Sequence, residues 1–191
     1  MKGLLAIASA CLLFAACSGG PSFRNTDITG ANFGGELALA DASGNPRTIS
    51  EFRGKAVVLF FGYTYCPDVC PTTMLEIKQA LEQLGPDSGR VQVLFVTLDP
   101  ERDTRELLSR YVQGFDPRFI GLSGDAASTA KVAKEFRVFY QKVPGRSPES
   151  YSIDHTSGIY VFDARGRLRL YAKPGNPGDL SADLHTLLNA G

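Results

Sequence analysis

The feature that most constrains the fold is an alternation of continuous apolar runs with a segment of helical periodicity. Residues 56–61 (AVVLFF) are apolar along their length and residues 91–98 (VQVLFVTL) are mostly apolar, as expected of strands buried on both faces of a sheet. Between them, residues 72–84 repeat apolar side chains at helical spacing, which predicts an amphipathic helix. This alternation predicts an α/β domain of three layers, with a central mixed β-sheet flanked by helices on both faces.

The same alternation continues to the C-terminus. Residues 158–162 and 168–172 are predicted to pair as strands across the turn at 163–166. The stretch 144–156 has no regular pattern, and an irregular stretch of that length in a compact domain is often functional. The other predicted elements are strands at 36–40, 119–122 and 139–143 and helices at 104–112, 126–136 and 180–188.

The composition excludes several classes of protein. With 191 residues, of which 43% are hydrophobic, the chain is long enough for one ordinary domain of about 150 residues. Its 20 basic and 20 acidic side chains balance, so a nucleic acid partner is not expected. The four cysteines fall into two distant pairs, Cys11 with Cys17 and Cys66 with Cys70, which is not the framework of a disulfide-stapled miniprotein.

The N-terminus has the pattern of an export signal. Lys2 precedes an uncharged apolar run at residues 3–16, which at about 14 residues is too short for a helix that spans a bilayer of roughly 30 Å. Residues 14–17 (FAAC) resemble the lipobox of bacterial lipoproteins, in which the cysteine carries the lipid. We therefore expect an exported lipoprotein, anchored through Cys17 and facing the periplasm or another extracytoplasmic space. The alternative is a plain secretory signal that is cleaved nearby, with Cys17 incidental.

These features divide the chain into three parts. The segment after Cys17 is rich in Ser, Gly and Pro and has no apolar periodicity, which is typical of a tether. We expect a lipoprotein signal peptide at 1–16, a lipid-anchored flexible tether at 17–30 and one folded domain at 31–191. Cys11 lies within the signal peptide and has no predicted role.

The spacing and the position of Cys66 and Cys70 indicate a chemically active pair. They stand between the strand at 56–61 and the helix at 72–84, and Pro71 suits the first turn of a helix. A helix N-terminus favours thiolate over thiol, and open α/β sheets place their sites at the carboxyl ends of strands. At this spacing the two α-carbons lie about 6 Å apart, which permits either a disulfide or joint ligation of one ion. The alternative is a pair of half-buried structural thiols, which an oxidising compartment disfavours.

One of the two histidines is the candidate third ligand. His155 lies in the predicted loop just before the last strand pair, and in a thioredoxin-like arrangement this loop faces the start of the cysteine helix. His185 lies on the C-terminal helix and is expected to be a solvated surface residue. Two thiolates and one imidazole form a soft set of three ligands, which suits Cu(I) or Cu(II). Zinc usually takes a fourth ligand, which Asp68 or Asp154 could supply, although a cap or a solvated loop charge also explains either residue.

Four segments resemble the Sco/SenC family, and they occur in the family's order between about Gly35 and the C-terminus. The cysteine segment is 61–71 (FGYTYCPDVCP), and the other three are 96–104 (VTLDPERDT), 115–122 (FDPRFIGL) and 154–158 (DHTSG). One departure is Tyr65, where many members have a histidine directly before the first cysteine. That position varies in the family and is not a required ligand.

The resemblance implies a thioredoxin-like fold that binds one copper ion through Cys66, Cys70 and His155, with a reversible disulfide between the two cysteines. It implies a metallochaperone, without enzymatic turnover, that delivers copper to the dinuclear copper centre of cytochrome c oxidase subunit II during assembly. The other expected partners are an upstream copper donor or reductant and, through the lipid, a membrane. The alternatives are a thiol–disulfide reductase of that centre, which does not need the histidine, a redox or copper sensor, or a peroxide-reducing protein.

Overall fold

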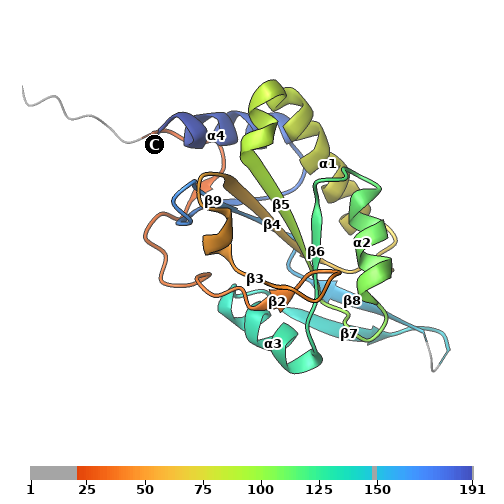
Figure 1. The fold of residues 1–191 in the computed structure, drawn as a ribbon. Helices are drawn as coiled ribbons and strands as arrows, with labels where there is room; N and C mark the ends of the chain where they lie inside the picture. Colours follow the sequence, from red (N-terminus) through yellow and green to blue (C-terminus); the bar gives the residue numbers. More distant parts are fainter. Residues whose placement is uncertain (1–20, 148–149, 191) are drawn as a thin grey trace, which may run out of the picture.

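The computed structural model describes residues 21–147 and 150–190, so Cys11 and Cys17 lie outside the described residues. Its central sheet is mixed, as predicted, and has the strand order β1-β10-β9-β4-β5-β6 (Figure 1). The central strand β4 runs parallel to β5, which runs parallel to β6, whereas β4 runs antiparallel to β9. The strands are β1 (Thr26–Asp27), β10 (Leu168–Ala172), β9 (Ile159–Phe162), β4 (Ala56–Gly62), β5 (Val91–Thr97) and β6 (Ile120–Leu122).

The apolar run of β4 holds the layers together because both of its faces are buried. Val58 and Phe60 face one hydrophobic cluster, whereas Val57, Leu59 and Phe61 face another on the opposite side of the sheet. Burial of each such side chain contributes about 1.5–3 kcal/mol. The prediction of a strand buried on both faces is therefore confirmed.

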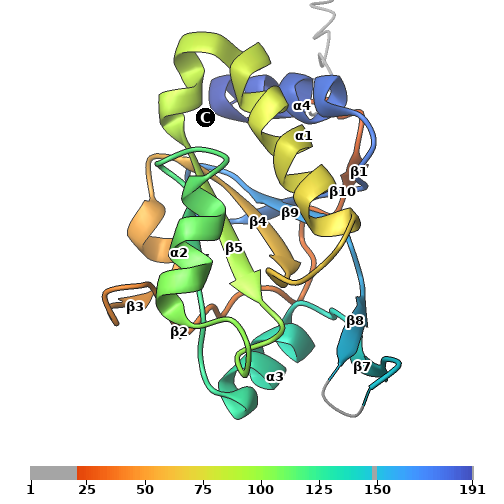
Figure 2. The same ribbon diagram turned by 90° about the vertical axis from the view of Figure 1, so that its right-hand side faces the viewer.

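Helices cover both faces of the sheet. Leucines of α1 and α4 join the first cluster, and the two helices lie side by side, whereas α3 joins the second cluster (Figures 1 and 2). The predicted three-layer α/β fold is thus confirmed. Across the described residues, no helix combines the length and the apolar character that a bilayer crossing requires. The helices are α1 (Val69–Leu84), α2 (Arg105–Gln113), α3 (Ala126–Glu135) and α4 (Pro177–Asn189), with 3₁₀ helices at Ile49–Phe52 and Gly85–Arg90.

The stretch 144–156, predicted as an irregular loop, contains a strand of a separate β-hairpin. Strand β7 (Tyr140–Pro144) pairs antiparallel with β8 (Tyr151–His155), outside the six-stranded sheet. The sequence pattern missed β8 because Ile153 is its one buried residue, so the strand has no apolar run. The strand predicted at 36–40 is also shorter than expected: only β2 (Leu39–Ala40) forms, paired with β3 (Pro46–Arg47).

Part of the segment predicted as a tether contacts the folded domain. Strand β1 adds to the edge of the sheet by pairing with β10. The backbone N–H groups of Arg24 and Asn25 donate to the carboxylate of Asp183 at 2.8 and 2.9 Å, and this α4 side chain is 1% exposed. The chain is therefore attached to the domain from Arg24 onward, within the stretch that the sequence predicts as tether.

We expect Asp183→Ala to lower the free energy of unfolding by about 1–3 kcal/mol, because the N–H groups of Arg24 and Asn25 lose their acceptor. Urea unfolding of the full chain measures this loss, and trypsin should then cut more rapidly after Arg24. The matched control is Asp179→Ala, because Asp179 meets Arg24 only in an exposed ion pair, worth less than about 1 kcal/mol. Equal losses in the two variants would contradict this account of the N-terminal attachment.

Candidate metal centre

The two cysteines lie in the turn between β4 and α1. The N–H of Cys66 donates to the carbonyl of Tyr63 at 3.3 Å, which closes the turn. Helix α1 begins at Val69, three residues before the predicted start, so Cys70 lies in its first turn. The N–H of Cys70 donates to the sulfur of Cys66 at 3.3 Å. In the first turn of a helix this N–H has no acceptor within the helix, so the sulfur of Cys66 serves as its hydrogen-bond partner.

A buried carboxylate holds the segment that leads into Cys66. Asp103 is 2% exposed and accepts hydrogen bonds from the N–H of Thr64 at 3.0 Å and from its hydroxyl at 2.6 Å. It also accepts one from the hydroxyl of Thr97, at the end of β5, at 2.6 Å. Burial raises the pKa of Asp103, while the threonine donors act in the opposite direction. Sequence reasoning assigned Asp103 no role, although its place after a central parallel strand is a signal for such a residue.

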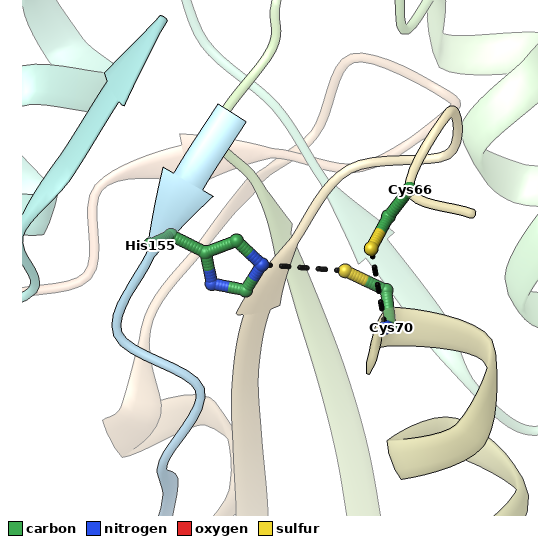
Figure 3. Close-up of side chains that lie close together, drawn as sticks. All are labelled: Cys66, Cys70 and His155. Atoms are coloured by element: carbon green, nitrogen blue, oxygen red, sulfur yellow. Dashed lines mark hydrogen bonds between the residues drawn. The ribbon is translucent and has the colours of Figure 1, made fainter. Parts of the chain in front are cut away.

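The imidazole of His155 points at the cysteine pair from the end of β8 (Figure 3). Its Nε2 lies 3.4 Å from the sulfur of Cys70, and its Nδ1 lies 2.9 Å from the carbonyl oxygen of Thr156. A carbonyl only accepts, so Nδ1 carries the hydrogen and Nε2 presents its lone pair to the sulfur. Burial lowers the pKa of His155, which keeps the ring neutral. The histidine therefore faces the cysteines as predicted, but from a strand end rather than a loop.

The three side chains form one compact donor group. One ligand atom from each of Cys66, Cys70 and His155 lies within 4.8 Å of the other two, and within the described residues this is the one such group of three. Both cysteines are free thiols. Cys70 is fully buried, and burial raises the pKa of its thiol, which matches an S–H that donates to Nε2. Cys66 is half-buried.

The donor group opens on one side into a cleft of about 390 Å³. The cleft lies between the turn at 66–69 and the strand residues 152–155, and it is lined by Cys66 and His155. On the inner side, the rings of Phe60 and Tyr63 meet the imidazole edge-on, at centroid distances of 6.3 and 6.1 Å. The arrangement combines an apolar wall with access from solvent.

The other candidate residues stand outside the donor group. Asp68 and Asp154 are exposed and do not belong to it, so neither provides a fourth ligand in this arrangement. Tyr65 is 58% exposed. His185 is exposed on α4, as predicted. Two sulfurs and one nitrogen without a carboxylate fit a soft ion such as Cu(I) better than a four-coordinate zinc site.

Comparisons with known proteins bear on both the fold and the site. Residues 25–189 match the family model described as SCO1/SenC. The chain is 42% identical to the mitochondrial protein SCO2 homolog of Bos taurus over 134 residues, which are 69% of this chain and 50% of that protein. The chain thus spans about half the length of the curated relatives that it matches first.

Two solved structures are similar over most of the chain. The structure of Bradyrhizobium japonicum ScoI with copper bound is 41% identical, with a TM-score of 0.73, and the match covers 81% of this chain and 99% of that one. The solution structures of apo Sco1 from Thermus thermophilus are 43% identical, with a TM-score of 0.76 and coverages of 87% and 97%. These matches confirm the predicted thioredoxin-like fold. Copper in the first structure, together with the donor group of this chain, agrees with the predicted copper cofactor.

We expect Gly62→Ala to lower the free energy of unfolding by about 1–3 kcal/mol, as overpacking of a core does. A Cβ at Gly62 would lie 2.8 Å from the sulfur of Cys70 and 3.0 Å from the ring of Phe95. The backbone must move, or Cys70 must rotate away from His155. Urea unfolding measures this loss of stability. The control is Gly89→Ala, because the position has open space around it. Equal stability of the two variants would show that the site tolerates the added methyl group.

Proposed function

This chain belongs to the SCO1/SenC family, and on that premise we propose that it binds one copper ion through Cys66, Cys70 and His155. The observation that carries the proposal is the convergence of two sulfurs and one imidazole nitrogen within 4.8 Å. The relative from Bradyrhizobium japonicum, at 41% identity, has copper bound. The ion is cargo that the protein passes on.

The local chemistry suits binding of the ion with release of protons. Nε2 of His155 already offers a lone pair, because Nδ1 donates to the carbonyl of Thr156. The thiols of Cys66 and Cys70 each lose a proton as the metal binds, so affinity rises with pH. Two thiolates and a neutral imidazole give a complex of net charge −1 with Cu(I) and 0 with Cu(II).

Release of the ion requires access, and the cleft supplies it. Cys66 and His155 line the open side, whereas Cys70 is buried beneath them. Ligands of a partner can therefore displace Cys66 and His155 first, while Cys70 still holds the ion. We propose that the recipient is the dinuclear copper centre of cytochrome c oxidase subunit II. We also propose that the protein acts outside the cytoplasm, anchored by a lipid on Cys17.

A second candidate function is reduction of a disulfide in the same partner. The asymmetry of the pair favours it, because Cys66 is accessible and receives a hydrogen bond from the N–H of Cys70, whereas Cys70 is buried. The Cys66 thiolate would attack a partner disulfide, forming a mixed disulfide and releasing one partner thiolate. Cys70 would then give up its thiol proton, which the released partner thiolate takes up, attack the Cys66 sulfur and release the second partner thiolate. Two electrons reach the partner, and an upstream thiol reductant restores the pair.

We expect His155→Ala to lower the Cu(II) affinity at least about 100-fold, because changes that only reorient a metal-bound histidine already cost about 10- to 100-fold. Copper titrations use the full chain with Cys11 and Cys17 replaced by Ser, so that the proposed site holds the only thiols. His185→Ala is the matched control, since it removes the other histidine, which is exposed. One copper per chain is expected, and unchanged affinity in His155→Ala would remove this residue from the site.

The same variant separates the two candidate functions in cells. Copper delivery requires Cys66, Cys70 and His155, whereas disulfide reduction requires the cysteines alone. Oxidase assembly that fails in both His155→Ala and Cys66→Ser supports copper delivery. Assembly that survives His155→Ala but not Cys66→Ser would identify the reductase as the physiological activity.

A further inference from the structure

The position of His155 depends on what fastens a small hairpin to the domain. Strands β7 and β8 form their own two-stranded sheet, and two strands alone are only marginally stable in water. One attachment is the N–H of Ile153, which donates to the hydroxyl of Tyr63 at 3.2 Å. Others run to the segment between β5 and α2, where Glu101 pairs with Lys142 at 2.6 Å.

Arg102 makes the most extensive of these attachments. Its Nη1 donates to the carbonyl of Tyr151, the first residue of β8, at 2.8 Å, and its Nε donates to Asp99 at 2.5 Å. The hydroxyl of Tyr151 donates to the other oxygen of Asp99 at 2.7 Å, so hydrogen bonds connect the three residues in a closed ring. The guanidinium carbon lies 3.5 Å from the centroid of the Tyr151 ring, so the cation also stacks on the aromatic face.

The same guanidinium reaches the segment that carries the first cysteine. Its carbon lies 4.9 Å from the centroid of the Tyr65 ring and 5.9 Å from that of Tyr63. Tyr65 directly precedes Cys66 in the chain. Arg102 therefore contacts both the strand that ends in His155 and the segment that leads into the cysteine pair. Its Nη2 is buried without a hydrogen-bond partner among the described residues, which leaves the aromatic rings as the neighbours that compensate for its burial.

We propose that Arg102 is a positioning residue of the metal centre: it fastens β8 against the cysteine segment and thereby sets the distance between the His155 imidazole and the sulfurs. The inference rests on the proposed copper function. A lysine cannot replace the arginine, because an ammonium is a point charge without the planar fork that bonds Asp99 and stacks on Tyr151.

A double-mutant cycle tests this inference. We expect Arg102→Gln to lower the Cu(II) affinity of the full chain about 10- to 100-fold, the usual effect of losing a residue that orients a metal-bound histidine. In the His155→Ala background the same substitution should cost nothing further, because Arg102 then has no histidine to position. Arg47→Gln is the matched control, since Arg47 is likewise a partly buried arginine held by a carboxylate, Asp41, but lies in β3, outside the metal centre.

The outcomes separate the inference from the proposed function. An equal loss in both backgrounds would mean that Arg102 supports the fold generally, and it would overturn the inference. If His155→Ala weakens copper binding but Arg102→Gln does not, the inference fails and the proposed site stands. If His155→Ala has no effect, the proposed site fails and the inference with it. Should Arg102→Gln not fold, Arg102→Lys goes through the same cycle, with the same non-additivity expected.

Discussion

The metal centre depends on the hydrogen bond from Nδ1 of His155 to the carbonyl of Thr156. Because this bond places the ring hydrogen on Nδ1, Nε2 keeps a lone pair that faces the sulfur of Cys70 at 3.4 Å. The opposite tautomer would present an N–H to the sulfurs, and the imidazole could not ligate a metal there. Burial against Phe60 and Tyr63 keeps the ring neutral and limits its movement.

The burial of the two cysteines differs in a way that suits a carrier. Cys70 lies fully buried in the first turn of α1, where a Cβ at Gly62 would lie only 2.8 Å from its sulfur. Cys66 lies at the edge of an open cleft. The buried thiol and the strand-borne imidazole define the geometry of the site. The accessible thiol leaves a path by which a partner can reach the ion. One site thus combines a defined ligand geometry with transfer of the ion to a partner.

Much of this architecture could be predicted from the sequence because its signals are local. The apolar run of β4 and the helical periodicity of α1 each lie within one short stretch of the sequence. Together they place Cys66 and Cys70 at the carboxyl end of a central strand. The strand β8 could not be predicted, since it buries only Ile153. The role of Arg102 was also hidden, because its contact with Tyr151 joins residues 49 positions apart. The lipid on Cys17 stays a prediction.

The proposed copper site requires that two sulfurs and one imidazole nitrogen enclose a single ion. X-ray absorption spectroscopy of the Cu(I)-loaded chain, with Cys66 and Cys70 as its only thiols, measures this coordination directly. We expect two sulfur ligands and one nitrogen ligand with the outer-shell scattering of an imidazole, and this imidazole scattering should disappear in His155→Ala. Coordination by sulfur alone, or by more than two sulfurs shared between chains, would contradict the proposed site.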